Sequence, residues 1–236
     1  VLQYMRRIVG SDEFINGIER WCFWITDDKA DAALEIPIIK ERADLVRDLR
    51  LGKSDKSAQR LAAYPYRFRE MHETTTNSLV IPSVSSENRE YVPVGFVDKK
   101  TVVTNLAFVI YDCDPWIFGV VSSKMHNLWI KAVCGGLETR IRYSSELGYN
   151  TFPFPAITDE QKKDIRNCVN QVIAAREEEF DKTYAQMYKK DEMSDDLRFA
   201  HSMLDLQIER CYRDEPFVSD DERLDCLFEL YEKIGG

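Results

Sequence analysis

The two prolines of the motif Phe152-Pro153-Phe154-Pro155 constrain the fold of this chain more than any other feature. Proline lacks a backbone N–H and fixes its φ angle, so this motif can neither continue a helix nor form a central strand. Before the motif, short strand-like patterns alternate with helical ones, whereas the residues after it have helical patterns almost throughout. The sequence therefore predicts a chain of two parts, residues 1–155 and residues 156–236.

Charge follows the same division. Residues 1–155 contain 20 Lys and Arg and 20 Asp and Glu, whereas residues 156–236 contain 12 and 21, so the whole net charge of -9 lies in the second part. Residues 36–69 hold nine basic and four acidic residues. The net negative charge of the whole chain argues against binding to nucleic acid. Binding to phosphates, however, depends on the charge of one face and not on the net charge. The first part can therefore meet an anionic partner, and the second part is expected to face away from it.

The expected elements give the fold class. In the first part we predict a buried strand at 21–25, helices at 38–51 and 54–63 (the second capped by Ser54), strands at 79–84, 91–97 and 101–111, a helix from Pro115 to about 133 and a strand at 137–143. In the second part we predict three helices, at about 158–188, 195–212 and 219–233, with capping boxes at the first and third. The fold class is α/β (α+β): a mixed strand and helix domain followed by a small all-helical bundle.

Signatures of the common enzyme classes are missing from the sequence. It contains no GxGxxG, GxxxxGK[ST], GxSxG or HExxH motif, and neither the six Cys nor the three His have zinc-ligand spacing. No apolar run is long enough for a membrane span and no secretory signal opens the chain, so we expect a cytoplasmic protein with reduced cysteines and no contact with membranes. An enzyme with a Cys or His nucleophile stays open as a minor alternative.

Three charged residues stand two positions apart in the predicted strand 137–143. On one strand, Glu138, Arg140 and Arg142 would point to one face. Arginine forks onto guanine O6 and N7, and glutamate accepts from cytosine N4, so such a row can read base edges. An exposed strand face with self-paired charges is the alternative.

Further polar residues suit a nucleic-acid surface. Asn105 lies in a strand-like run and can fork onto adenine, although it can equally be a turn residue. The polar stretch between the strands at 79–84 and 91–97 can contact phosphates or bases, or form a turn held by its own side chains. It contains Ser83, Ser85, Ser86, Asn88 and Arg89. The helix from Pro115 adds Lys124 and His126, while its aromatic residues are expected in the core.

Several long segments together resemble a known family. Its motifs match the following stretches of this chain: Ser85-Ser86-Glu87-Asn88-Arg89-x-Tyr91-Val92-Pro93-Val94-Gly95-Phe96, Phe118-Gly119-Val120-Val121-Ser122-Ser123-Lys124-Met125-His126-x-x-Trp129, Cys134-Gly135-x-Leu137-Glu138-x-Arg140-x-Arg142-Tyr143-Ser144 and Tyr149-Asn150-x-Phe152-Pro153-Phe154-Pro155. Further matches lie at 197–205 and 219–232. The chain is similar to the C-terminal part of the MmeI-like type IIG/IIL restriction-modification enzymes, which fuse a nuclease, an adenine-N6 methyltransferase and a target recognition domain in one chain.

The resemblance implies roles for individual residues. Glu138 and Arg140 would specify one base pair of double-stranded DNA, and Arg142 would act with Asn105 or Leu106 on a second. Ser83 would act with the Asn105 region on a third. A further group is predicted to contact the DNA backbone: Ser85, Ser86, Asn88, Arg89, Lys124, His126, Tyr143 and Ser144.

The resemblance also implies what this chain lacks. Residues 1–155 would be the target recognition domain and residues 156–236 a helical C-terminal domain, with no catalytic site and no cofactor in either. The parent enzyme would use S-adenosylmethionine and Mg²⁺, held by the methyltransferase and nuclease domains with which this chain would be partnered. The alternative is a protein–protein interaction or assembly domain with an acidic helical face.

Overall fold

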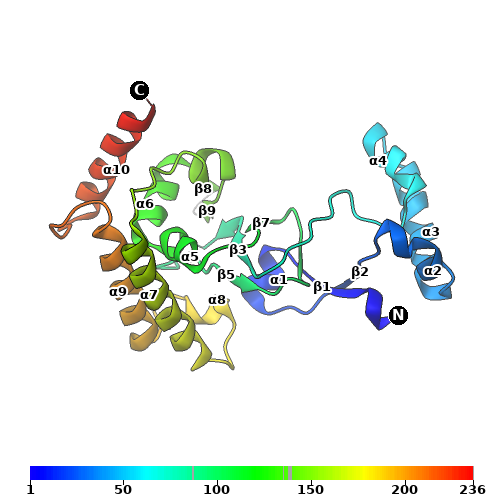
Figure 1. The fold of residues 1–236 in the computed structure, drawn as a ribbon, viewed down its shortest axis with the longest axis horizontal. Helices are drawn as coiled ribbons and strands as arrows, with labels where there is room; N and C mark the ends of the chain where they lie inside the picture. Colours follow the sequence, from blue (N-terminus) through cyan, green and yellow to red (C-terminus); the bar gives the residue numbers. More distant parts are fainter. Residues whose placement is uncertain (87, 135, 138–139, 236) are drawn as a thin grey trace. The chain divides into compact units, whose positions relative to one another are not determined.

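The computed structural model describes residues 1–86, 88–134, 136–137 and 140–235. Figure 1 shows their ribbon. The chain forms two compact units. Unit 1 comprises Val1–Ile8, Glu19–Thr75 and Lys99–Val102, and unit 2 comprises Val9–Ile18, Thr76–Asp98 and Val103–Gly236. Unit 2 thus holds both strands and the helical C-terminal segment, so the division at residue 155 does not follow the packing and stays a prediction about domains.

Unit 1 is mainly helical. Strand β1 (Met5–Val9) pairs antiparallel with β2 (Trp21–Phe23), and the helices α2 (Ala30–Leu34), α3 (Pro37–Leu51) and α4 (Lys56–Arg60) follow. Short 3₁₀ turns lie at Leu2–Tyr4, Asp27–Lys29 and Leu61–Ala63. A small core forms around Tyr4, Ile25 and Ile39. Helix α3 confirms the prediction at 38–51, and Pro37 begins it because the first helical turn needs no N–H donor.

Two expectations for unit 1 were wrong. The strand at 21–25 ends at Phe23, and it is not buried throughout, because Trp21 is 56% exposed. Helix α4 is capped by Asp55 instead of Ser54: the Asp55 carboxylate accepts from the Ser57 N–H at 2.8 Å. A carboxylate satisfies an orphan N–H at a helix start as well as a hydroxyl does, and it adds a favourable charge.

The first sheet of unit 2 has three antiparallel strands. Strand β3 (Ser78–Pro82) is buried along its whole length between β5 (Gly95–Val97) and β7 (Ala107–Ile110). Helix α1 (Ser11–Asn16) packs on β3. The expected strand at 101–111 is instead two strands, β6 (Val102–Val103) and β7, separated by a turn at 104–106.

The second sheet corrects the expected strand at 137–143. It has the order β4-β9-β8, with β4 at Val84–Ser85, β8 at Gly136–Leu137 and β9 at Arg140–Arg142. Leu137 pairs with Arg140 across the antiparallel β8–β9 pair, so these residues belong to two strands that face each other. The expected single strand at 137–143 was therefore wrong: Arg140 and Arg142 share β9, and Glu138 lies outside the described residues.

Ser123 divides the long helix expected from Pro115. Helices α5 (Pro115–Ser122) and α6 (Lys124–Val133) meet there because Ser123 has an extended backbone, with φ -71° and ψ 159°. Its buried hydroxyl donates to the Val120 carbonyl at 2.7 Å and accepts from the His126 N–H at 3.3 Å. One serine therefore ends α5 and caps α6. A single turn of π-helix, Ser145–Tyr149, follows β9.

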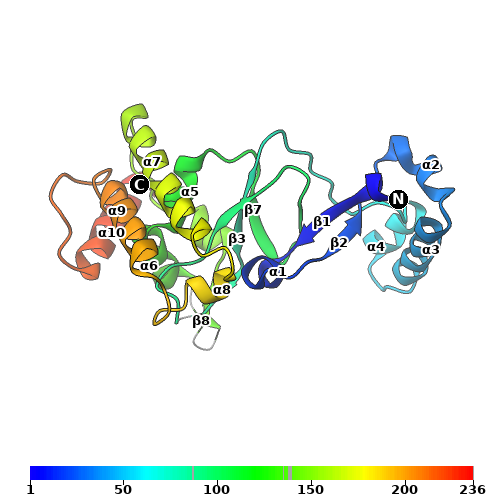
Figure 2. The ribbon, with the colours of Figure 1, turned by 90° about the horizontal axis from the view of Figure 1, so that it is seen from below.

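The C-terminal segment is helical, as expected, and shares its core with the rest of unit 2. It comprises α7 (Asp159–Glu177), α8 (Tyr184–Met187), α9 (Asp195–Glu209) and α10 (Asp220–Gly235). The single helix expected at about 158–188 is thus two helices, α7 and α8, separated by a turn at 178–181. Helices α7 and α9 lie side by side, with α5 against α7 (Figure 2). Helix α10 packs on α6, where Trp129 contacts Phe228 and Tyr231. None of the described helices is both long and apolar enough to cross a membrane.

Candidate nucleic-acid interface

Ser83 joins two segments on which base-reading residues are predicted. Its hydroxyl donates to the Leu106 carbonyl at 2.8 Å, in the turn between β6 and β7. Its own carbonyl accepts from the Tyr143 N–H at 2.9 Å, directly after β9. Val84, the next residue, pairs with Arg142. Ser83, Leu106 and Arg142, which sequence reasoning placed on three separate segments, therefore lie together in unit 2.

The side chains at this place face solvent. Arg142 and Asn105 are exposed, and Leu106 is 59% exposed although it is apolar. Arg142 makes no ion pair with any residue that the structure describes. Asn105 belongs to the turn, so the expectation of a strand position was wrong. Arg140 stands two positions before Arg142 on β9, and Glu138 lies outside the described residues.

Sequence reasoning missed Ser11, the first residue of α1. Its hydroxyl donates to the Leu106 carbonyl and accepts from the Ser83 N–H at 2.9 Å. The contact partners are 72 and 95 positions away in the chain. No local pattern marks such a role, and a serine at a helix start is ordinarily explained by the helix itself.

Gly10 lets the turn approach the start of α1 closely. A Cβ atom at residue 10 would lie 2.9 Å from Thr104 Oγ1 and 3.1 Å from Leu106 Cβ. The Thr104 N–H donates to the Val9 carbonyl at 2.8 Å, so the turn is also held by the backbone before Gly10. A side chain at residue 10 would push the turn away, which is why the close approach requires glycine.

Three residues predicted to contact the DNA backbone are buried. His126, Tyr143 and Ser85 are only 1%, 5% and 3% exposed. His126 Nε2 and the Tyr143 hydroxyl form a hydrogen bond at 2.9 Å, and burial lowers the pKa of His126 to about 3, so this ring is neutral. As described, these side chains cannot reach a phosphate from the surface; they support the backbone around β9 instead, and this corrects the prediction.

The remaining backbone candidates are at least partly accessible. Lys124 forms an ion pair with Asp220 at 3.0 Å, and Ser144 caps the Ser145–Tyr149 turn by accepting from the Leu147 N–H. Asn88 is exposed and donates its N–H to the Ser86 hydroxyl, whereas burial lowers the pKa of the half-buried Arg89. The loop is therefore partly held by its own side chains, the alternative considered from the sequence.

Unit 1 carries the basic segment 36–69. Five of its nine cations are engaged: Lys40 and Arg47 with Asp44, Arg67 with Asp27, Arg69 with Asp55, and Arg50 with three backbone carbonyls. Lys53, Lys56 and Arg60 are exposed and have no ion-pair partner among the described residues. Lys56 and Arg60 are four positions apart on α4, where like charges repel unless an anion lies between them.

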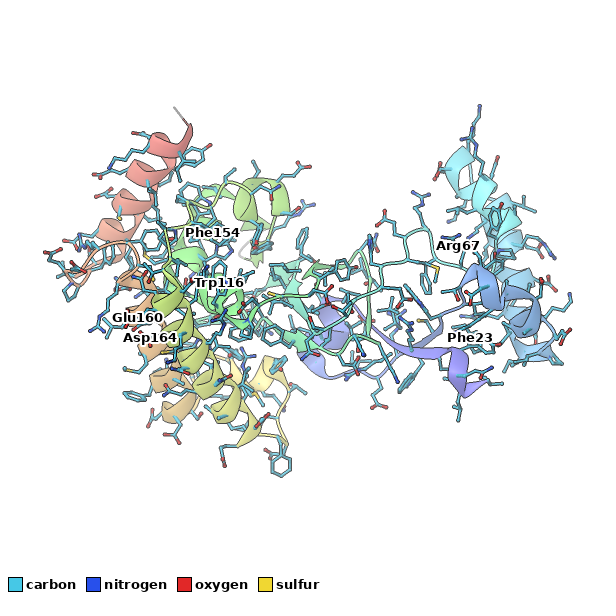
Figure 3. All side chains as sticks on the ribbon, viewed as in Figure 1. Phe23, Arg67, Trp116, Phe154, Glu160 and Asp164 are labelled. Carbon is cyan, nitrogen blue, oxygen red and sulfur yellow. The ribbon has the colours of Figure 1, made fainter. Side chains whose placement is uncertain are left out.

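Unit 1 also contains a groove of about 630 Å³. Apolar side chains such as Trp21, Phe23 and Leu45 line it together with the guanidinium groups of Arg42 and Arg67. Figure 3 marks Phe23 and Arg67 among the side chains of this unit. Glu41 and Cys22 are the only acidic, histidine or cysteine residues that line the groove in the described structure, and burial raises the pKa of Cys22 to about 11, so its thiol stays protonated near neutral pH.

None of the six thiols is activated as a nucleophile. Burial raises the pKa of all six thiols, to about 12 for Cys113 and about 11 for Cys22 and Cys211, so none is a thiolate near neutral pH. Buried His201 is held neutral, with a pKa well below its ordinary value, and bonds to the Tyr188 hydroxyl. No cluster of three or more His, Cys, Asp or Glu among these residues could hold a metal ion.

Comparisons with known proteins settle the family. Residues 2–156 match the family described as "MmeI, target recognition domain", and residues 157–235 match "MmeI, C-terminal domain". The chain belongs to the MmeI family. The predicted target recognition domain and the resemblance on which it rested are confirmed.

Two relatives place this MmeI-family chain within longer proteins. It is 41% identical over 234 residues to DNA methyltransferase A of Bacillus subtilis (strain 168), covering 99% of this chain and 26% of that protein. Its fold matches the type IIL restriction-modification enzyme MmeI, solved in complex with DNA, with a TM-score of 0.92, 36% identity and coverage of 99% of this chain and 31% of that one. The chain thus spans about a third or less of the relatives that it matches.

Proposed function

We propose that this chain reads the sequence of duplex DNA at the place where Ser83, Leu106 and Arg142 meet. The observation that supports the proposal is this convergence, made by hydrogen bonds and strand pairing between three distant segments, within a target recognition domain. The structural relative was solved in complex with DNA, which supports the same partner for this chain.

The chemistry of the exposed side chains suits base edges. Arg142 carries five N–H donors in a fork that fits guanine O6 and N7, and Asn105 offers the donor and acceptor pair that fits adenine N6 and N7. The Leu106 carbonyl is occupied by two hydroxyls, so only the apolar side chain of that residue is available to a base. Glu138 and Arg140 are proposed for a further base pair on the resemblance alone.

Catalysis is proposed to lie outside this chain. Methyl transfer and strand cleavage belong, in this proposal, to methyltransferase and nuclease domains of a longer parent protein, which would bind S-adenosylmethionine and Mg²⁺. The raised thiol pKa values and the buried neutral His126 and His201 support the assignment, because these thiols stay protonated near neutral pH and these two rings are removed from the surface.

The proposal is tested by selection from randomised duplex DNA with the 236-residue chain. The expected result is an enriched short motif, in which Arg142→Ala loses about tenfold discrimination at one base pair and keeps the others. Arg210→Ala is the matched control, because Arg210 is also exposed but lies at the end of α9. Equal loss in both variants would contradict the assignment.

A second experiment addresses the pair that the resemblance assigns. Glu138→Lys combined with Arg140→Asp in a parent enzyme should change one base of the methylated site. Full activity at an unaltered site would refute this role. If the chain does not bind DNA and co-purifies with a protein, the result supports the alternative of a protein–protein interaction or assembly domain.

A further inference from the structure

We infer that Ser11 is a positioning residue for base reading: its hydroxyl fixes where the turn 104–106 stands relative to Ser83 and β9. That this position matters for base reading rests on the proposed function. The hydrogen bonds that Ser11 makes do not depend on DNA. Ser11 itself is not proposed to touch a base.

The Ser11 hydroxyl stands between the two segments that it would hold in register. On one side it accepts the Ser83 N–H at 2.9 Å, and on the other it donates to the Leu106 carbonyl. Ser83 carries the connection onward, because its carbonyl accepts from the Tyr143 N–H beside Arg142. The start of α1 is therefore bonded directly to the turn, and through Ser83 to β9.

Ser83 cannot take over the hydrogen bonds that Ser11 makes, because too few hydroxyl hydrogens are available. Three O···O contacts join the two hydroxyls and the Leu106 carbonyl, including 3.1 Å between Ser11 Oγ and Ser83 Oγ, but the two serines supply only two hydroxyl hydrogens. Removing the Ser11 hydroxyl leaves the Ser83 N–H without its acceptor and the Leu106 carbonyl with one donor. The remaining bond is a single flexible link between Ser83 and the turn.

Close packing at Gly10 and a hydrogen bond to Thr104 also hold the turn. The missing Cβ at Gly10 allows Leu106 and Thr104 to approach α1, and the Leu106 N–H donates to Thr104 Oγ1 at 3.3 Å. The start of α1 therefore holds the turn by close packing at Gly10 and by the hydrogen bond from Ser11. Leu106 and Asn105 are exposed on a turn whose backbone is fixed by these contacts.

The test compares Ser11→Ala with Leu106→Ala in the randomised-duplex selection. If Ser11 positions the turn, both variants lose discrimination at the same base pair, by about tenfold, while the other positions keep theirs. The matched control is Ser219→Ala, which removes the serine hydroxyl that accepts from the Glu222 N–H at the start of α10, away from the turn. Unchanged selectivity in Ser11→Ala, or an even loss at every position, overturns the inference.

Amide hydrogen exchange separates this inference from the proposed function. In Ser11→Ala the Ser83 amide should exchange at least about tenfold faster than in the unchanged chain, because its acceptor is gone, while the Val109 amide in β7 keeps its rate. If the unchanged chain selects no motif, the proposed function fails, and faster Ser83 exchange still supports the positioning role. If the Ser83 rate is unchanged, the positioning role is refuted, whatever the selection shows.

Discussion

The Tyr91 hydroxyl donates a hydrogen bond to Asp205 Oδ2 at 2.7 Å, across 114 positions of the chain. The other oxygen of the same carboxyl accepts from the Lys124 N–H at 2.7 Å, at the first residue of α6. Tyr91 also stacks on His201, one turn before Asp205 on α9. One buried side chain of the helical segment therefore fastens both the loop before β5 and the start of α6.

Asp205 should make stability fall as pH rises from about 4 to about 7. Burial is the largest cause that raises the pKa of Asp205 to about 7, and the nearby Glu209 raises it further. The hydrogen bonds from Lys124 and Tyr91 lower the pKa, but by less. The folded state then holds the proton that the unfolded state has lost, so ionisation favours unfolding in this window. Relative to Asp205→Asn, the unchanged chain should lose on the order of 3 kcal/mol between pH 5 and pH 8.

Urea unfolding of both proteins at several pH values measures this difference. The comparison is needed because His126, with a pKa of about 3, has the opposite sign: its contribution is lost as pH falls below about 6.5. The contribution of His126 is the same in both proteins, so it cancels in the difference between their free energies of unfolding. A difference that does not vary with pH would show that Asp205 is ionised in the folded state.

Gly119→Ala should destabilise the chain, although alanine is the better helix former. A Cβ at residue 119 in α5 would lie 2.4 Å from Ile165 Cγ2 and 3.2 Å from Leu204 Cδ1, so α7 and α9 would have to move. Overpacking of this kind costs about 1–3 kcal/mol, more than the helix propensity returns. The change would be measured as a lower Tm.

Gly52→Ala is its matched control. At the end of α3 a Cβ would meet only backbone oxygens at 3.5 and 3.8 Å, which are ordinary contacts, and φ is -75°. We expect no loss of stability and a gain of up to about 1 kcal/mol. Equal destabilisation by both substitutions would contradict the packing argument.

Arg176→Lys should also destabilise unit 2. Arg176 is 5% exposed, and its guanidinium donates to the Tyr188 hydroxyl at 2.7 Å and to the Val94 carbonyl at 2.8 Å. A lysine ammonium lacks the planar fork that reaches both acceptors. We expect a loss of about 1–3 kcal/mol by chemical denaturation, because one buried acceptor is left without its donor. An exposed substitution, Lys190→Arg, should leave the midpoint unchanged.

Replacing Lys53, Lys56 and Arg60 with glutamine should weaken DNA binding equally for all sequences. If all three contact phosphates, the slope of log K against log salt concentration should fall in magnitude by up to about 3, because each contact contributes about 0.9. The control replaces Lys162, Lys182 and Lys189, which are ion-paired with acidic residues of the helical segment. Equal slopes for both triple variants would exclude α4 from the DNA contact.

Local signals accounted for the elements that could be predicted. Helix α3 follows from its apolar periodicity, and the Thr158–Gln161 capping box begins α7 as expected, because both depend on residues within one or two turns. The family and the helical C-terminal segment followed from long motifs. The resemblance also implied that Arg142, Leu106 and Ser83 act together, but the hydrogen bonds that join their segments could not be predicted from it.

The features that were not predicted from the sequence depend on contacts between residues that are distant in the chain. Alternation over 137–143 did not reveal that Leu137 and Arg140 face each other, because a period of two in the sequence does not show where one strand ends and the next begins. His126 was a candidate for phosphate because its sequence position does not show that its side of α6 is buried. Ser11 was missed because its partners are 72 and 95 positions away.

Strand β9 lies between β4 and β8, so its backbone is paired on both edges. A substitution at Arg140 or Arg142 changes a side chain without removing a ladder hydrogen bond, since those bonds belong to the main chain. If Arg140 and Arg142 read bases, as we propose, a new target sequence requires only the exchange of a side chain in a chain that keeps its fold. Recognition of a different DNA site is then separated from the stability of the domain.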